Sequence, residues 1–296
     1  RRVLFRSGGL TLTGAGTWTG GNLGSGFALE AGRLTVGSGA ELVKSGSGTG
    51  SIRDYTLATT GTGRVKLVEG AIDARNGSIT TPAIDNRGVF EFAGDASVLD
   101  ASVAFFSNNG GSVIKSAGSG VSRLGLRLED TNGQWTVGSG TLRLDNSVGI
   151  SATGTLTVNA GAGTLEFNAG RFVGTAINAA AGSTVDITNG TISILGTYTS
   201  AGTTNFRNNF DWSIGSFTST GTTNFAGNSD PFFGLGRVAF GSPFVGATTN
   251  FIGGRTTFGS SYTSVATSIS GDAWALLESA GTTTSLNLSG GTLAGA

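Results

Sequence analysis

Two carboxylates are the side chains whose type and spacing in this sequence are best suited to chemistry. Glu166 and Asp186 each stand at the centre of a short triplet with apolar ends, and the two triplets are built alike. If the two triplets stack as neighbouring rungs of one sheet, the carboxylates lie about 4.8 Å apart. Such a pair could hold a hard cation such as calcium, or act as the two acids of a retaining glycosidase.

The same positions also fit a solvated ladder that does no chemistry. Arg143 stands at the equivalent place before Glu166, and Asn205 and Asn224 follow Asp186, so charges offset one another and the amides stack. No third carboxylate and no cleft-forming loop accompanies the pair, and exposed ion pairs contribute little. We therefore predict no catalytic, cofactor-binding or metal-binding residue. Whether the Glu166/Asp186 ladder binds a cation stays open at this point.

The composition removes several classes of function. The chain has no Cys and no His, so it has neither a thiolate nor the commonest general base and metal ligand. Its formal net charge is zero and its basic residues are scattered, which argues against nucleic-acid binding. No apolar stretch approaches the roughly 20 residues that a membrane span needs. We expect a protein that is not an enzyme, binds no cofactor and has no membrane span.

Other recurring motifs are better explained by structure than by a site. Gly-x-Gly occurs at 14–16, 37–39 and 138–140, and Thr-x-Thr at 11–13, 17–19, 155–157 and 197–199. We interpret the glycine motifs as corners, because a full phosphate-binding pattern is missing. The threonine pairs do not recur once per rung, as an ice-binding ladder would require. Among the four tryptophans we expect Trp135 in the core, and Trp212 is the best candidate for an exposed ring that stacks on a sugar.

A repeat of about 20 residues must position all of these side chains. Leu144, Phe167, Ile187, Phe206 and Phe225 each close a short triplet. The steps between these five positions are roughly 19–23 residues. A repeat of this length is typical of a solenoid, in which one unit cannot bury its apolar face alone and stacks on its neighbours.

Residues 182–206 show how one repeat is built. The triplet 185–187 alternates as a strand does, Asn189-Gly190 is a strong turn signal, and a second apolar triplet at 192–194 follows. After Tyr198 and a further turn at Gly202, the pattern returns to its starting phase. Three short strands and three corners per repeat predict a right-handed, three-sided parallel β-helix, with about a dozen rungs of roughly 19–23 residues. Apolar side chains would fill the tube, while Thr, Arg, Lys, Glu and Asn would face water.

The pattern persists without a charged or Pro-rich linker, so we predict one continuous β-solenoid over residues 8–296, truncated at both ends. Residues 1–7 resemble the translation of a sequencing-library adapter, and we exclude them. The spacing is irregular at about 95–128 and 227–261, where we expect longer excursions, including 230–233. Terminal rungs of a solenoid are open sheet edges, so end-to-end self-association and aggregation are expected.

Several motifs together carry a resemblance to a known type of protein. They are the run 105–113, the segment 140–144, the repeated Gly-Thr-Thr-Asn-Phe at 202–206 and 221–225, and the segment 286–293. This style resembles the repeat regions of large bacterial surface proteins, the adhesin-like β-helices of the filamentous-haemagglutinin and autotransporter-passenger type. The resemblance covers nearly all of residues 8–296 and is one of pattern.

The resemblance implies a module outside the cell or at the bacterial cell surface, and it carries no catalytic residue to this chain. We expect a rigid stalk or a multivalent binding surface, whose partners would be glycans or proteins of a host or a biofilm. The alternative is a β-helix protein that binds or degrades polysaccharides. That alternative requires acidic and basic residues to converge on adjacent rungs beneath long loops, whereas the charges of this sequence are sparse and dispersed.

Overall fold

The computed structural model is an all-β protein, 72% strand. It describes residues 9–24, 32–75, 80–100, 104–145, 150–207, 212–227, 238–240 and 242–295. These residues contain 28 strands and no helix. The first fourteen strands are β1 (Gly9–Leu12), β2 (Ala15–Trp18), β3 (Gly21–Gly24), β4 (Gly32–Val36), β5 (Glu41–Lys44), β6 (Thr49–Arg53), β7 (Tyr55–Leu67), β8 (Ala71–Arg75), β9 (Ile84–Phe92), β10 (Ser97–Asp100), β11 (Phe105–Asn109), β12 (Ser112–Lys115), β13 (Val121–Leu124) and β14 (Arg127–Thr131).

The second half of the chain contains longer strands, several of which continue around a corner. They are β15 (Gln134–Val137), β16 (Thr141–Leu144), β17 (Ile150–Val158), β18 (Thr164–Ala179), β19 (Thr184–Ser200), β20 (Thr203–Arg207), β21 (Trp212–Ala226), β22 (Val238–Phe240), β23 (Phe244–Gly253), β24 (Arg255–Phe258), β25 (Tyr262–Ile269), β26 (Trp274–Leu277), β27 (Gly281–Leu288) and β28 (Thr292–Gly295).

All pairings are parallel and fall into three ladders, which form three faces of a tube. The first face starts with the pair β1–β4 and ends with β26–β28. The second face starts with β2–β5 and ends with the first halves of β25 and β27. The third face starts with β3–β6 and ends with the second halves of β25 and β27. Each turn of the chain therefore adds one strand to each ladder.

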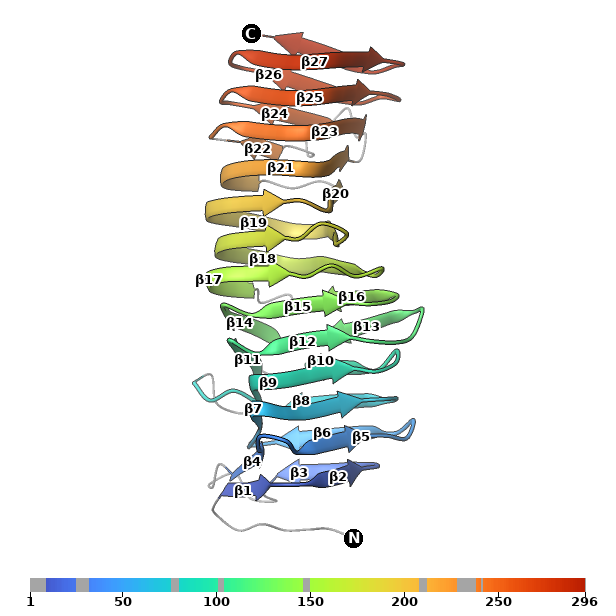
Figure 1. Cartoon of the computed structure of the whole chain (residues 1–296), viewed down its shortest axis with the longest axis vertical. Helices are drawn as coiled ribbons and strands as arrows, with labels where there is room; N and C mark the ends of the chain where they lie inside the picture. Colours follow the sequence, from blue (N-terminus) through green and yellow to red (C-terminus); the bar gives the residue numbers. More distant parts are fainter. Residues whose placement is uncertain are drawn as a thin grey trace.

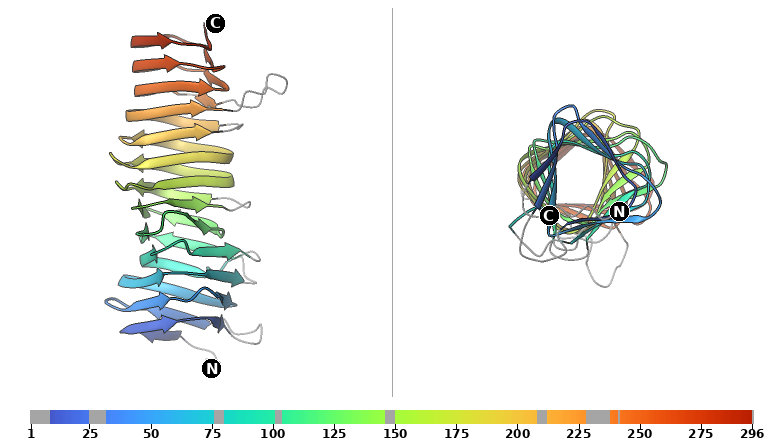
Figure 2. Two further views of the ribbon diagram at one scale, coloured as in Figure 1. Left: turned by 90° about the vertical axis from the view of Figure 1, so that its right-hand side faces the viewer. Right: turned by 90° about the horizontal axis from the view of Figure 1, so that it is seen from below.

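The stack is a β-solenoid of about 11 turns, which confirms the predicted fold and comes close to the expected dozen rungs. Figure 1 shows the coils piled along one axis with the two termini at opposite ends, and Figure 2 shows the tube end on. The five positions that defined the repeat lie above one another on the third face. Leu144 pairs with Phe167, Phe167 with Ile187, Ile187 with Phe206, and Phe206 with Phe225.

Stacked aromatic rings fill the C-terminal half of the tube. Because the coils repeat in register, rings at equivalent positions stack face to face at about the strand spacing. The ring centroids of Phe206 and Phe225 are 5.0 Å apart, and Phe251 continues the column at 5.1 Å. A second column contains Tyr198, Phe217, Phe244 and Tyr262, with centroids 5.0, 4.9 and 5.3 Å apart. Phe240 and Phe258 form a third stacked pair.

Backbone contacts between coils explain the glycine of the Gly-Thr-Thr-Asn-Phe motif. Gly202 and Gly221 lie at the same corner in successive coils, and the threonines that follow them pair in register. A Cβ added at Gly221 would collide with the carbonyl oxygen of Gly202, and one added at Gly202 would collide with that of Ser183. The predicted corners at 37–39 and 138–140 also hold, since Gly39 and Gly140 have positive φ angles of 77° and 60°.

The corner predicted at Asn189-Gly190 lies inside β19, between its third-face part at 184–187 and its first-face part at 192–194, and the register against β18 shifts there. One detail of the predicted layout needs correction. The longer excursion expected over 95–128 is wrong for the described part of that range, which holds strands β10 to β14 in regular order. In the second irregular range, β22, β23 and β24 keep the ladders intact, whereas residues 230–233 lie outside the described residues.

Candidate functional site

The outward side chains of the third face form the candidate site. Arg143, Glu166, Asp186, Asn205 and Asn224 stand on successive coils and are direct register partners. The same column continues to Asn250, Ser268 and Asn287. The predicted outward ladder is therefore present, and its Glu and Asp are neighbours. We call the run from Arg143 to Asn250 the polar ladder.

Each carboxylate of the polar ladder already has two partners. Arg143 Nε donates to Glu166 Oε2 at 2.8 Å, and Thr188 Oγ1 donates to Glu166 Oε1 at 2.9 Å. Arg207 Nε lies 3.1 Å from Asp186 Oδ2, and Asn205 donates to the other oxygen of Asp186. The Glu166 side chain is only 10% exposed, so its charge is largely removed from water and balanced by Arg143.

The asparagines extend this arrangement as a directed chain of hydrogen bonds. Asn250 Nδ2 donates to Asn224 Oδ1 at 2.8 Å, and Asn224 Nδ2 donates to Asn205 Oδ1 at 2.7 Å. Asn205 then donates to Asp186, so the chain of amides ends on a carboxylate. A column of threonines runs beside the polar ladder, two residues before it in each coil. They are Thr141, Thr164, Thr184, Thr203, Thr222 and Thr248, and all are partly exposed.

This geometry presents a regular polar surface along the third face. All four oxygens of Glu166 and Asp186 accept bonds from Arg, Thr or Asn, so both carboxylates are fixed in place within the column. Within the described ranges, no group of three or more Asp, Glu, His or Cys residues could hold a metal ion. What remains available is a repeating lattice of hydroxyl and amide groups.

A second ladder lies inside the tube, and the sequence reasoning missed it. Thr59 Oγ1 donates to Asn86 Oδ1 at 2.6 Å, and Asn86 Nδ2 donates to Asn108 Oδ1 at 2.8 Å. Asn108 Nδ2 then donates to Asp130 Oδ2 at 2.8 Å. All four side chains are buried and occupy successive coils of the first face. We call these four residues the buried ladder.

Asp130 ends the buried ladder and is surrounded by donors. Besides Asn108, the backbone N–H of Gly133 donates to Oδ1 at 2.8 Å and Trp135 Nε1 donates to Oδ2 at 3.0 Å. Burial raises the pKa of the Asp130 carboxyl, and these three donors oppose that rise. Trp135 is fully buried, as predicted, so its indole serves the interior of the tube and not a sugar.

Two lysines are also buried, which corrects the expectation that lysines face water. Lys115 is fully buried, and its Nζ donates to Gly94 O at 3.1 Å, Asp95 Oδ1 at 2.9 Å and Ser122 Oγ at 3.0 Å. The hydrogen bond from Lys115 lowers the pKa of Asp95. Lys44 lies at an equivalent corner, where carbonyl oxygens of 45, 46, 48 and 69 surround its Nζ at 2.9–3.5 Å. Desolvation lowers the pKa of Lys44.

A signal for the buried ladder was present in the sequence. Asn86, Asn108 and Asp130 each stand two residues after an inward apolar residue, and they recur once per coil. Their spacing from that apolar residue places them inside the tube, but in the sequence a polar residue at an inward position looks like a break in the alternation of apolar and polar residues.

For the tryptophans, the ring of Trp274 is exposed, at 52%, whereas the side chain of Trp212 lies outside the described residues.

Comparison with known proteins identifies no relative of this chain. No family model matches the chain, and neither a curated protein nor a solved structure matches it. The part of the chain that the structure describes contains no helix with the length and hydropathy of a membrane span. A functional assignment must therefore rest on the fold and on the side-chain geometry.

Proposed function

We propose that this chain is a non-enzymatic structural or adhesive repeat module of a large bacterial cell-surface or secreted protein. It acts as a rigid stalk, as a multivalent binding surface, or as both. The observation that carries the proposal is the polar ladder, in which every carboxylate is satisfied by neighbouring coils and a regular row of amides continues beyond them. The sequence resemblance to adhesin-like β-helices supports the location outside the cell.

The stalk role follows from the geometry of the stack. About 11 turns at about 4.8 Å per turn extend the rod over roughly 50 Å. Three continuous parallel ladders run along that length, so bending the rod requires many interstrand hydrogen bonds to deform together. A module of this kind projects whatever is attached to one end away from what is attached to the other.

The adhesive role follows from the repetition of the third face. Thr203 and Asn205, Thr222 and Asn224, and Thr248 and Asn250 form three successive copies of one Thr-x-Asn pair. Groups repeated at one spacing contact a repetitive ligand several times at once, so weak individual contacts add to a useful affinity. Glycans or proteins of a host or a biofilm are the proposed partners.

The rival function is binding or degradation of polysaccharides. Degradation requires a carboxylate that can reach a substrate, and the low exposure of the Glu166 and Asp186 side chains, 10% and 18%, favours binding over cleavage. Incubation of the chain with a panel of plant, microbial and animal polysaccharides separates these roles. We expect retention on one or more of them without release of reducing ends; release that depends on Glu166 or Asp186 would establish an enzyme and refute the proposal.

The stalk role has its own test. The chain is inserted between a bacterial surface anchor and an epitope tag, and a Gly/Ser linker of equal residue number serves as the control. We expect an antibody to reach the epitope above the surface polysaccharide of the cell only when the solenoid carries it, because a flexible chain samples compact states. Equal access with both spacers would contradict a stalk.

A further inference from the structure

The strands of the second and third faces become free of charge after β20. Among the described strands of these two faces, the last charged residue is Arg207. The strands β21, β23, β25 and β27 supply both faces to the four coils that follow, and they contain no Asp, Glu, Lys or Arg. In these coils the two outward columns of the third face hold Thr, Asn, Ser and Ala. A ligand that lies there meets hydroxyl and amide groups and no charge.

Asp186 sets the direction of the amide row in the polar ladder. A carboxylate only accepts hydrogen bonds, so Asn205 turns its Nδ2 toward Asp186 and its Oδ1 toward the next coil. Asn224 Nδ2 donates to that oxygen at 2.7 Å, and Asn250 Nδ2 donates to Asn224 Oδ1 at 2.8 Å. All three amides therefore point the same way along the tube, because each orientation follows from the one before it.

The amides of this row keep hydrogen-bonding capacity for a ligand. An amide group has two N–H protons and two oxygen lone pairs, and the contacts of Asn224 with its neighbouring coils use one of each. Asn224 and Asn250 are partly exposed, and so are Thr222 and Thr248, which stand two residues before them. Successive coils lie about 4.8 Å apart. The third face thus presents oriented donors and acceptors at one spacing along the axis.

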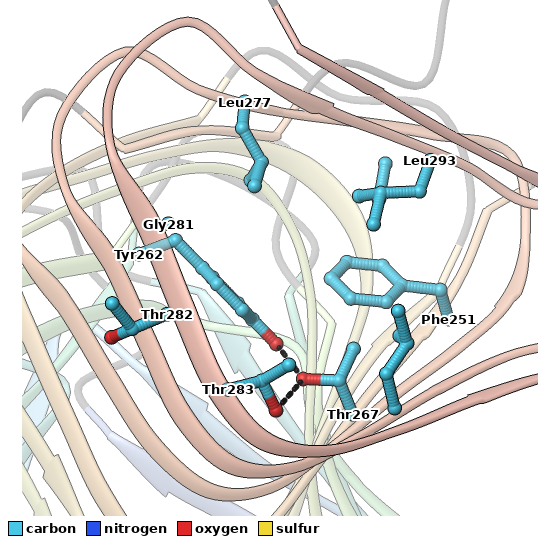
Figure 3. Close-up of a pocket in the computed structure, with 10 residues that line it drawn as sticks. Phe251, Tyr262, Thr267, Leu277, Gly281, Thr282, Thr283 and Leu293 are labelled. Carbon is cyan, nitrogen blue, oxygen red and sulfur yellow. Dashed lines mark hydrogen bonds between the residues drawn. The ribbon is translucent and has the colours of Figure 1, made fainter.

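The hydroxyls on the inner side of the same coils are used inside the tube. Figure 3 shows Thr267, whose Oγ1 lies 2.7 Å from Tyr262 Oη and donates to Thr283 Oγ1 at 3.0 Å. A cavity of about 90 Å³ lies beside them, and Phe251 and Leu277 are among its apolar walls. A polar chain gains little there, so recognition is left to the outward columns.

We propose that the ligand of the third face is a neutral, unbranched polysaccharide that lies along the axis of the tube. A sugar of an extended β-linked chain is about as long as one coil spacing, so its hydroxyls meet an equivalent pair of Thr and Asn in successive coils. An anionic polymer finds no cation on β21, β23, β25 or β27. Because the polar ladder is the surface of the proposed adhesive role, this assignment of its ligand rests on that role.

Two further consequences follow from the geometry. The outward columns of these coils contain no aromatic ring on which a sugar could stack, so each sugar contributes only weak hydrogen bonds and only long chains bind well. Asp186 is a positioning residue, since it orients the amides through Asn205 and lies outside the charge-free coils.

Titration with oligosaccharides of defined charge and length tests the class of ligand. The probes are neutral linear fragments of cellulose, xylan and mannan, and anionic fragments of alginate and polygalacturonate, with binding measured by calorimetry. We expect the neutral fragments alone to bind, with an affinity that rises steeply until the chain spans the five coils from Asn205 to Asn287. The affinity should be the same at low and at high salt, because no ion pair forms.

A pair of double variants locates the contact. Asn224→Ala/Asn250→Ala removes two amides of the row, whereas Thr131→Ala/Thr153→Ala removes two hydroxyls that bridge neighbouring coils of the first face at 2.9 Å. We expect the first variant to bind at least about tenfold more weakly than the parent, because each lost hydrogen bond to the ligand costs about fivefold in affinity. The control should bind as the parent does.

A second matched pair tests the role of Asp186. Asp186→Asn and Arg207→Gln both remove the ion pair between these residues, but only Asp186→Asn replaces the carboxylate with a group that also donates. In that variant Asn205 is free to turn. We expect severalfold weaker binding and doubled side-chain amide signals of Asn205 in NMR spectra of Asp186→Asn, and neither change in Arg207→Gln.

Other outcomes would overturn the proposal. Binding of the anionic fragments that weakens with salt would refute a neutral ligand and leave an adhesive role in place. If no fragment binds, the ligand is not a polysaccharide, and the adhesive role would need a protein partner. Equal losses in the two double variants would place the contact outside the amide row. Equal losses in Asp186→Asn and Arg207→Gln would show that the ion pair, and not the orientation of the amides, supports binding.

Discussion

Two asparagines with the same pattern of hydrogen bonds should differ in their contribution to stability, because one is buried and donates to a carboxylate, whereas the other is partly exposed and donates to an amide. Asn108 and Asn224 each accept one hydrogen bond from an amide in a neighbouring coil and donate one to the next. Asn108 is fully buried, and its acceptor is the Asp130 carboxylate. Asn224 is partly exposed, and both of its partners are neutral amides.

The magnitudes follow from these contacts. Asn108→Ala removes a neutral hydrogen bond of about 1 kcal/mol and one to a charged group of about 1.5–3 kcal/mol, and it leaves Asp130 buried with one donor fewer. We expect a loss of about 3–4 kcal/mol in the free energy of unfolding. Asn224→Ala leaves its partners within reach of water, so we expect a loss of about 0.5–1 kcal/mol.

Chemical denaturation of the two variants and the parent measures the difference. Tryptophan fluorescence is a suitable probe of unfolding, because one of the four tryptophans, Trp135, donates its indole N–H to Asp130 at 3.0 Å. Urea midpoints are compared at unchanged slope, so that a change in cooperativity is not mistaken for a change in stability. The reasoning would be refuted if Asn108→Ala and Asn224→Ala lost equal free energy of unfolding. It would also be refuted if Asn108→Ala lost less than about 1 kcal/mol.

Three further predictions follow from the interior and from the polar ladder. Phe225→Ala removes a ring that stacks on both Phe206 and Phe251, so it should cost about 3–5 kcal/mol in the free energy of unfolding; a loss within the surface range of about 0.5 kcal/mol would contradict the stacked core. The pKa of Asp95 is lowered by Lys115, so its contribution to stability is present above the ordinary pKa of Asp and disappears as the pH falls through the lowered value. Asp95→Asn should therefore be less stable than the parent in melts at neutral pH and approach it in acid, whereas a pH-independent gap would show that the charge is irrelevant. The double variant Glu166→Gln/Asp186→Asn should respond to calcium as the parent does, because Arg, Thr and Asn already occupy both carboxylates; a calcium-induced rise in melting temperature in the parent alone would establish a cation site.

The sequence was sufficient to predict the outer surface of the fold. Apolar residues at 144, 167, 187, 206 and 225 recur at steps close to one turn, and the structure pairs all of them in register. A residue between two inward apolar neighbours must point outward, so its position follows from the sequence as well. The ion pair of Arg143 with Glu166 was therefore predictable. The alternation of apolar and polar residues, together with one repeat length, is sufficient to predict this part of the fold.

The interior was less predictable, because its polar residues depend on partners from other coils. Over 95–128 the strands keep their order, but Asn108, Lys115 and Ser122 occupy inward positions that elsewhere hold Leu, Val or Phe. The loss of apolar spacing looked like a loss of strands. Lys115 is tolerated inside because Gly94, Asp95 and Ser122 satisfy its three protons, and no local pattern shows that.

Engineered disulfides test the central claim, a parallel solenoid with the polar ladder in register, most directly. The chain has no Cys, so a double variant contains only the introduced pair. Asn224 and Asn250 are register partners on neighbouring coils, about 4.8 Å apart, which suits a disulfide. Ser268 lies one coil further along the same column and serves as the control. We expect mild oxidation to close Asn224→Cys/Asn250→Cys within the monomer and to leave Asn224→Cys/Ser268→Cys open, as read by mass spectrometry of tryptic peptides. Failure of the first pair to close, or equal closure of both, would contradict the register and with it the ladder.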